Sequence, residues 1–444
     1  MKPGDRAELR ITDMNGEGCG IGRHGGIVVF VRDTVTGDTC LAEITEVRKN
    51  YALAECVSLI EASPYRREPD CPVYTECGGC TLSHVTAETE LELKKNMVQQ
   101  ALRREGLTDI RVEDVLYSSR TGYRNKVIYH FDKTGTLGYY SQKSRRIQPE
   151  SIRCLLNPPI CTEILQATEK YIRNTPAFPT LPLRSLYIRT NHTGEAAVSV
   201  ITESSCGKRE KAVLAEYAAY LNETCPGKIT GVLHGKENKG KYAVPAYTVI
   251  WRDRYVYDTF GELQLRISPE GFYQVNHDGA ALLAETVLDF AGETRITHAA
   301  DLYCGSGFFG LLLEKKYPEI SVTGIEINPD SIRDAEYNRK TNRLDNMAFF
   351  CGNAADYRKN TANLPEFVIV DPPRAGMSER MREELCELCA ERIAYVSCNP
   401  ITLARDLRML IERGYCAAKV TPVDMFPGTG HIESVVCLYR EKID

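Results

Sequence analysis

A cysteine and a glutamate near the C-terminal end of the chain could together perform nucleophilic chemistry. Cys398 ends an apolar stretch and precedes Asn399-Pro400, where a helix is expected to begin, and Glu433 precedes a second apolar stretch. A lone cysteine is more often a small buried hydrophobe, and a glutamate beside a strand is usually a solvated charge. If both lie at the same edge of a sheet, however, they form a nucleophile and a base. The N-terminal dipole of the following helix would then stabilise the Cys398 thiolate.

A glycine-rich segment upstream has the spacing of a nucleotide-binding loop. An apolar strand ends near Asp301, glycines follow at Gly305, Gly307 and Gly310, and Glu326 closes the next predicted strand. Glycines let backbone N–H groups approach a ligand, and an acidic residue about twenty positions later can accept hydrogen bonds from ribose hydroxyls. The same spacing occurs in NAD-binding domains, so an NAD-dependent oxidoreductase is one alternative. Asp301 favours S-adenosylmethionine, because its carboxylate suits an ammonium group better than a pyrophosphate.

The elements that would position these residues follow from the pattern after about residue 263. Apolar strands alternate there with helical patterns of ten or more residues; the strand candidates are Ala299–Tyr303, Val322–Ile327, Met347–Cys351, Phe367–Val370 and Ile393–Ser397. This alternation predicts an α/β fold with a doubly wound, mostly parallel sheet. Such sheets bind ligands at the carboxyl ends of their strands, which is where Glu326, Asp371 and Cys398 fall.

The chain before this region is organised differently. Short strand-like segments predict a small β-barrel of OB-like type; they are Ala7–Thr12, Gly26–Val31, Thr39–Val47 and Tyr51–Leu59. We assign the six glycines between positions 16 and 26 to one connection. A helix is predicted near Thr86–Glu105, and residues 111–265 mix strands and helices. We therefore expect three domains, at 1–60, 61–265 and 266–444. If the 86–105 helix packs on the third domain, the middle domain is not one continuous stretch of the chain.

Four cysteines in the central region could hold a metal: Cys71, Cys77, Cys80 and Cys154. The chain has 17 cysteines and no apolar stretch after Met1, so we expect a cytoplasmic protein with thiols rather than disulfides. The cysteine spacing allows a four-thiolate zinc site or an iron–sulfur cluster equally, or some of the four could be incidental.

Composition narrows the functional classes. The 444 residues contain no apolar run of about 18, which excludes a membrane span. The formal charge is −5, which excludes a globally basic nucleic-acid binder but allows a local basic face. Basic and aromatic side chains that could form such a face, and stack on splayed bases, are Arg120, Tyr123, Arg124, Lys126, Tyr139, Tyr140, Lys143, Arg145 and Arg146.

In their order, the C-terminal motifs resemble those of the RNA (uracil-5-)-methyltransferase family. They span residues 272–433 and comprise Phe272-x-Gln274-x-Asn276, the glycine loop, Gly324-x-Glu326, Gly352-Asn353, Asp371-Pro-Pro-Arg374-x-Gly376, Ser397-Cys398-Asn399-Pro400 and His431-x-Glu433. The resemblance implies a Rossmann-like class I methyltransferase domain with Cys398 as nucleophile and Glu433 as proton-abstracting base. It also implies that S-adenosylmethionine is held by Gln274, Tyr303, Glu326, Asn353 and Asp371. Phe308 departs from the pattern, because some relatives carry there an asparagine that contacts the cofactor.

The resemblance extends to the rest of the chain. The N-terminal barrel is similar to a TRAM domain, which binds RNA, and the four cysteines are similar to the [4Fe-4S] site of the ribosomal members, with zinc as the alternative. A barrel plus four such cysteines favours 23S ribosomal RNA as substrate over transfer RNA. A non-catalytic RNA-binding factor is a further alternative. We predict no membrane contact and no protein partner.

Overall fold

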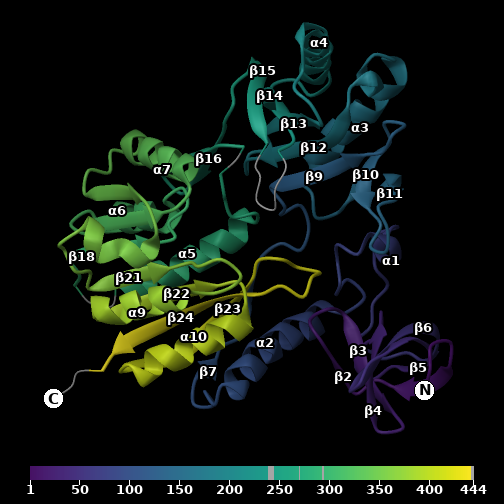
Figure 1. The fold of residues 1–444 in the computed structure, drawn as a ribbon, viewed down its shortest axis with the longest axis horizontal. Coiled ribbons are helices and arrows are strands. Elements are labelled where there is room, and N and C mark those ends of the chain that lie inside the picture. The colour runs from purple at the N-terminus through teal and green to yellow at the C-terminus, as the bar shows by residue number, and fades with distance from the viewer. Residues whose placement is uncertain (239–244, 270, 293–294, 442–444) are drawn as a thin grey trace.

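The computed structural model describes residues 1–238, 245–269, 271–292 and 295–441, which form three parts (Figure 1). A small barrel lies at one corner, a central sheet carrying two long helices lies above it, and the largest sheet lies on the other side (Figure 1). Within the described ranges, no helix combines the length and apolar character needed to cross a bilayer.

The N-terminal barrel is a six-stranded sheet in the order β1-β5-β6-β4-β3-β2. Its strands are β1 (Arg6–Arg10), β2 (Asp13–Met14), β3 (Cys19–His24), β4 (Ile27–Arg32), β5 (Thr39–Val47) and β6 (Tyr51–Glu61). The assignment of the 16–26 glycines to one connection is wrong, because β3 runs through them. A Cβ on Gly20 would lie 2.6 Å from Ile11 Cγ2, so glycine is needed here for close packing of the strand inside the barrel.

The central domain is a seven-stranded sheet in the order β11-β10-β9-β12-β13-β14-β15. These strands are β9 (Lys126–Phe131), β10 (Leu137–Tyr140), β11 (Ile147–Gln148), β12 (Leu183–Thr190), β13 (Ala196–Thr202), β14 (Ile229–Lys236) and β15 (Ala246–Arg252). Helices α3 (Pro159–Asn174) and α4 (Lys208–Thr224) cover one face, where Val127, Ile188 and Tyr217 belong to one buried apolar cluster. Short helical turns complete the domain: α1 (Tyr74–Cys77), η1 (Pro149–Arg153) and η2 (Phe178–Thr180).

The largest sheet has the order β20-β19-β18-β21-β22-β24-β23-β7, with β8 also pairing β23. Its main strands are β18 (His298–Leu302), β19 (Ser321–Glu326), β20 (Met347–Cys351), β21 (Phe367–Val370), β22 (Arg392–Ser397), β23 (Tyr415–Asp424) and β24 (Glu433–Arg440). The five sequence-predicted strands lie within one residue of β18 to β22, which are mutually parallel. Strand β24 runs antiparallel to both neighbours. Buried apolar clusters line both faces, under α5 (His277–Gly292), α6 (Phe308–Lys316), α7 (Pro329–Thr341), η3 (Ala354–Asp356), α8 (Tyr357–Asn360), α9 (Glu379–Leu388) and α10 (Pro400–Glu412).

Segments from the middle of the chain also pack on this sheet. Helix α2 (Ala87–Arg104) lies along α10, and Val98 shares a buried cluster with Leu407. Strands β7 (Arg111–Val112) and β8 (Leu116–Tyr117) extend the sheet beside β23. The hairpin of β16 (Val256–Phe260) and β17 (Leu263–Ile267) buries Leu263 and Ile267 in the cluster under α5 and α6. The expected boundary at 265/266 thus falls inside β17.

Candidate active site

The predicted cofactor residues form a row along the carboxyl edge of the large sheet. Leu302 at the end of β18 pairs with Ile325 of β19 and with Val370 of β21. Tyr303, Glu326 and Asp371 come next in this register on three adjacent strands. The doubly wound topology therefore brings to one edge three residues that are up to 68 positions apart in sequence.

Cys398 and Glu433 lie opposite one another on the next two strands. Ser397 of β22 pairs with Ser434 of β24 in an antiparallel ladder, and Cys398 and Glu433 are the next residues in that register. Residues directly opposite in such a ladder have Cα atoms about 4.5–5.5 Å apart. Glu433 is buried, whereas Cys398 is partly open. The pairing of β22 with β24 thus delivers a thiol and a carboxyl group to the same place.

The electrostatic environment keeps the Cys398 thiol protonated. Burial raises the pKa of Cys398, the carboxylates of Glu433 and Asp371 add to the rise, Arg374 opposes it, and the net value is about 11. Asn399 caps α10, accepting the Ile401 N–H at 3.1 Å, but the net shift of the Cys398 pKa is upward, against the expectation of a stabilised thiolate.

The row of carboxyl groups has too few cations to balance it. Burial raises the pKa of Asp371 to about 7, with a further contribution from Asp301, and burial and Asp371 raise the pKa of Glu433 well above its usual value. Burial likewise raises the pKa of Asp301 to about 7, and its Oδ1 is buried without a hydrogen-bond partner. Arg374 opposes the rise in the pKa of Glu433. This edge therefore suits a positively charged ligand.

The glycine loop has the left-handed backbone that its sequence requires. Gly305 and Gly307 have φ values of 56° and 86°, and Tyr303 adopts φ 65°, an uncommon conformation for a residue with a side chain. Gly310 N–H donates to Asp301 Oδ2 at 2.8 Å, and Gly305 N–H donates to Glu326 Oε2 at 3.3 Å. The two acidic side chains thus hold the loop by accepting hydrogen bonds from its backbone N–H groups.

Phe308, the residue that departs from the family pattern, is part of the core. It is 7 % exposed, and its ring packs edge-on against Phe260 of the β16–β17 hairpin, with centroids 4.9 Å apart. A buried phenyl ring anchors the start of α6 to this hairpin instead of facing a ligand.

Hydrogen bonds also fix the two remaining predicted cofactor residues. Asn125 of the central domain donates its Nδ2 to the carbonyl of Gln274 at 2.7 Å, and the Gln274 side chain is buried. Asn353 is exposed, and its Oδ1 accepts the Ala355 N–H at 3.0 Å as the cap of η3. Gln274 therefore lies where the central domain meets the catalytic sheet, and Asn353 lies beyond the end of β20.

The structure adds an interaction that the motifs alone do not predict. Arg374 Nη2 lies 2.7 Å from His431 Nδ1, so that the guanidinium donates to the imidazole. Burial and Arg374 both lower the pKa of His431, which keeps the ring neutral. Both residues stand in the recognised motifs, but only the fold brings them together, because 57 positions separate them.

The loop between β23 and β24, residues 425–432, is held from several directions. Its carbonyl groups accept hydrogen bonds from Asn276 Nδ2 to Met425 (3.2 Å), Lys94 Nζ to Phe426 (3.2 Å), Tyr123 OH to Pro427 (3.1 Å) and Leu82 N–H to Gly428 (2.9 Å). Close contact with Gly16 of the barrel occurs at Gly430, where a Cβ would lie 1.4 Å from the Gly16 carbonyl oxygen. This loop carries His431 and ends at Glu433.

The four candidate metal-binding cysteines line one cavity of about 420 Å³. Cys71, Cys77 and Cys154 each raise the pKa of Cys80, after burial, so the four thiols lie within electrostatic reach. Among the described residues, no three of these sulfur atoms lie within 4.8 Å of one another. Four thiolates are the donor set of a zinc site and of an iron–sulfur cluster alike, so these residues fit either group.

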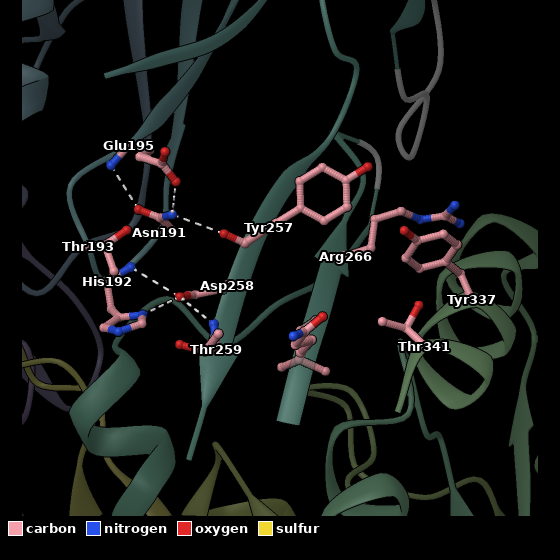
Figure 2. Close-up of a pocket in the computed structure, with 12 residues that line it drawn as sticks. Asn191, His192, Thr193, Glu195, Tyr257, Asp258, Thr259, Arg266, Tyr337 and Thr341 are labelled. Carbon is pink, nitrogen blue, oxygen red and sulfur yellow. Dashed lines mark hydrogen bonds and ion pairs between the residues drawn. The ribbon is translucent and has the colours of Figure 1, made fainter. Parts of the chain in front are cut away.

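A second cluster of metal-binding side chains, His192, Asp258 and His277, has a structural explanation. Figure 2 shows Asp258 accepting hydrogen bonds from His192 and Thr259 at the edge of a pocket between the β12–β13 turn and α7. Tyr273 OH occupies the other carboxylate oxygen at 3.1 Å. The two imidazole rings stack with centroids 4.7 Å apart instead of converging edge-on. Asp258 thus fastens the β16–β17 hairpin to the central domain.

Comparisons with known proteins agree with this geometry. Residues 261–441 match the family described as tRNA (Uracil-5-)-methyltransferase, and residues 2–57 match the TRAM domain. The fold is similar to the crystal structure of Pyrococcus abyssi tRNA (uracil-54, C5)-methyltransferase in complex with S-adenosyl-L-homocysteine, with a TM-score of 0.76 and 24 % identity over 97 % of this chain and 100 % of that one. The predicted fold class, with a TRAM barrel and a class I methyltransferase domain, is confirmed.

Two relatives align with this chain over nearly their whole length. An uncharacterized RNA methyltransferase of Clostridium acetobutylicum is 32 % identical over 99 % of this chain and 98 % of the relative. Another, from Halalkalibacterium halodurans, is 33 % identical over 98 % of this chain and 97 % of the relative. The NAD-dependent oxidoreductase alternative has no support from these relatives. The chain belongs to the RNA (uracil-5-)-methyltransferase family with an N-terminal TRAM domain.

Proposed function

We propose that this protein transfers a methyl group from S-adenosylmethionine to C5 of a uridine in structured RNA. The observation that carries the proposal is the register that places Cys398 opposite Glu433, beside Asp371 at the carboxyl edge of the sheet. This reaction needs a nucleophile and a base that lie next to one another. An RNA-binding factor without catalytic activity would not require that pairing.

The chemistry assigns a role to each of the two groups. Uracil C5 is a weak nucleophile, so the Cys398 thiolate adds to C6 and the C5=C6 electrons move toward O4, which forms an enolate. The enolate lets C5 form its bond to the methyl group while the bond from that methyl group to the sulfonium sulfur breaks, so that S-adenosylhomocysteine leaves. Glu433 then removes the C5 proton, the C5=C6 double bond re-forms and the sulfur leaves C6 as thiolate. The uracil ring must be reached from its face, so the target nucleotide is unpaired or flipped out of a helix.

The carboxyl groups of the edge suit the proposed cofactor. When bound, S-adenosylmethionine supplies the electrophilic methyl group. Gln274, Tyr303, Glu326, Asn353 and Asp371 would hold it. Its sulfonium and ammonium charges would complement Asp301 and Asp371, whose pKa values of about 7 reflect burial among like charges.

The RNA substrate is proposed to be 23S ribosomal RNA, with transfer RNA as the second candidate. The combination of a TRAM barrel with four clustered cysteines favours ribosomal RNA. The similarity to a Pyrococcus abyssi enzyme described as acting on tRNA weakens that argument, because it covers 97 % of this chain. A test of the function must therefore offer both RNAs.

The decisive experiment compares three variants on unmodified RNA with methyl-labelled S-adenosylmethionine. 23S ribosomal RNA and transfer RNA from cells lacking the protein serve as substrates. We expect Cys398→Ala to abolish methylation and to form no covalent RNA adduct, and Glu433→Gln to accumulate an adduct that survives denaturing electrophoresis. Cys416→Ala, at an exposed cysteine of β23, is the matched control and should behave like the wild type. Equal methylation by the wild type and Cys398→Ala would remove the mechanism.

We also propose that Cys71, Cys77, Cys80 and Cys154 hold a [4Fe-4S] cluster. The shared cavity and the four-thiolate donor set support this assignment. The methylation has no redox step, so the cluster's role would be structural. Protein purified without oxygen should contain about four iron and four sulfide per chain and absorb broadly in the visible range. Stoichiometric zinc without sulfide would contradict the assignment.

A further inference from the structure

Two loops meet across the end of the strand that carries the candidate nucleophile. Strand β22 lies between β21 and β24 in the sheet, and Cys398 directly follows β22. Arg374 lies in the loop after β21, and His431 lies in the loop before β24. The hydrogen bond of 2.7 Å from Arg374 Nη2 to His431 Nδ1 therefore joins the loops on either side of Cys398. Asn399 Nδ2 also donates to the Arg374 carbonyl at 3.0 Å, which ties the first loop to the residue after the nucleophile.

Electrostatic effects place Arg374 close to both reacting groups. Its charge opposes the rise in the pKa of Cys398 and of Glu433, and it lowers the pKa of His431. Arg374 and His431 are both exposed, whereas Ile432, between His431 and Glu433, is buried in the core of the sheet. The exposed pair therefore borders the space in which a ring bonded to Cys398 would lie.

The hydrogen bond fixes which ring nitrogen of His431 carries the proton. A guanidinium group has five N–H donors and no acceptor, so Nδ1 of His431 accepts. Partial burial of the ring, and then the charges of Arg374, Lys94 and Arg124, lower the pKa of His431, which leaves the ring neutral at pH 7. In a neutral imidazole one nitrogen accepts and the other donates, so the proton of His431 is on Nε2. Within the described part of the chain this N–H makes no hydrogen bond, and the donor pair, Arg374 and His431, can only donate to a ligand.

We propose that the donor pair binds O4 of the target uracil, with the Nε2–H of His431 as the donor that selects uridine; this deepens the proposed function and rests on it. O4 of uracil accepts hydrogen bonds, whereas cytosine carries an amino group, a donor, at the same position of the ring. O4 also gains negative charge when Cys398 adds to C6, so donors aimed at O4 stabilise the enolate more strongly than the unreacted ring. The donor pair thus favours uridine over cytidine and favours the step that activates C5.

The test compares uridine with 4-thiouridine at the methylated position of one RNA. Sulfur is a weaker hydrogen-bond acceptor than oxygen, so the contact to position 4 is weakened in the second RNA. His431→Phe keeps an aromatic ring beside Phe426 but removes the N–H donor. We expect this variant to lose about tenfold in kcat/KM on the uridine RNA and less than about twofold on the 4-thiouridine RNA. His431→Gln, which retains an N–H donor, should recover part of the loss on uridine.

A matched control and a second measurement make the outcomes distinct. His298→Phe, the same substitution at the amino end of β18, should change neither rate. Nitrogen NMR of the ligand-free wild type with isotope-labelled histidine should find the His431 proton on Nε2. A proton on Nδ1, or an equal loss on both RNAs in His431→Phe, would overturn the role of the donor pair while the wild type still methylates uridine. A wild type that methylates no RNA would instead overturn the proposed function, and the O4 contact with it.

Discussion

At the scale of single residues, Cys398 is held as a protonated thiol in the absence of ligand. The pKa of Cys398 is about 11, well above the usual 8.5 for cysteine, because of burial and two neighbouring carboxylates. A raised thiol pKa means that the thiolate fraction at pH 7.5 is very small and grows as the pH rises. Bound positive charge beside Asp371 would lower this pKa and activate the thiol.

This state predicts how Cys398 reacts with iodoacetamide. We expect alkylation of the free protein, followed by mass spectrometry of the Cys398 peptide, to accelerate with pH up to about 11. S-adenosylmethionine should increase the rate at pH 8 by about tenfold, whereas S-adenosylhomocysteine, which lacks the sulfonium charge, should increase it less. Fast alkylation at pH 7 without any ligand would show that the carboxylates do not control the thiol.

At the scale of elements, a buried ionic network attaches α2 to the loop that precedes β24. Lys94 is fully buried, and its Nζ contacts Glu90 Oε1 at 2.7 Å and Asp424 Oδ1 at 2.6 Å. Glu90 also pairs with Arg120 and accepts the Gly428 N–H at 2.7 Å. Burial raises the pKa of Asp424, and Lys94 opposes that rise. The network thus gives two buried carboxylates a shared cation and holds the first half of the 425–432 loop.

Replacing the central cation tests this attachment. Lys94→Met leaves Glu90 and Asp424 buried without their shared partner, so we expect a loss of about 3–5 kcal/mol in the free energy of unfolding, measured by urea denaturation. Hydrogen exchange in the 425–432 loop should also accelerate. The adjacent Lys95→Met is the matched control, because Lys95 pairs with a fully exposed Asp114; its effect should stay below about 1 kcal/mol. Equal losses in both variants would contradict a special role for the network.

At the scale of the whole molecule, the cysteine site lies where all three parts of the protein meet. Cys80 stands beside Gly428 of the 425–432 loop, the Leu82 N–H donates to that loop, and Cys154 follows η1 of the central domain. The barrel touches the same loop through Gly16. A cluster that joins these segments would therefore order the route by which RNA reaches Cys398.

Removing one ligand tests this connection at a distance. We expect Cys154→Ser to lose iron. Hydrogen exchange should then increase in residues 78–84 and in the 425–432 loop, because residues 78–84 lose their attachment to the central domain and contact that loop. Cys225→Ser, at a buried cysteine beside β14, should retain iron and leave the 425–432 loop protected. If Cys154→Ser loses iron but the loop stays protected, the cluster does not order that loop.

Much of the architecture could be predicted from local patterns. The alternation of apolar strands with helices placed β18 to β22 within one residue, because buried parallel strands read as short apolar runs. The glycines of the 16–26 segment led to a wrong prediction of one connection, since glycine is common both in turns and where strands pack closely. The packing against Thr34 and Ile11 shows which of the two applies at Gly20.

By itself, the sequence determined the residue types and motif order that define the family, and the strand ends at which Glu326, Asp371 and Cys398 stand. The tertiary structure alone decided which distant groups meet: Cys398 with Glu433, and Arg374 with His431. It also reversed the expected pKa shift of Cys398. The physical reason is that strand propensity and periodicity are local properties, whereas register, burial and the fields of neighbouring charges arise only when separate segments pack together.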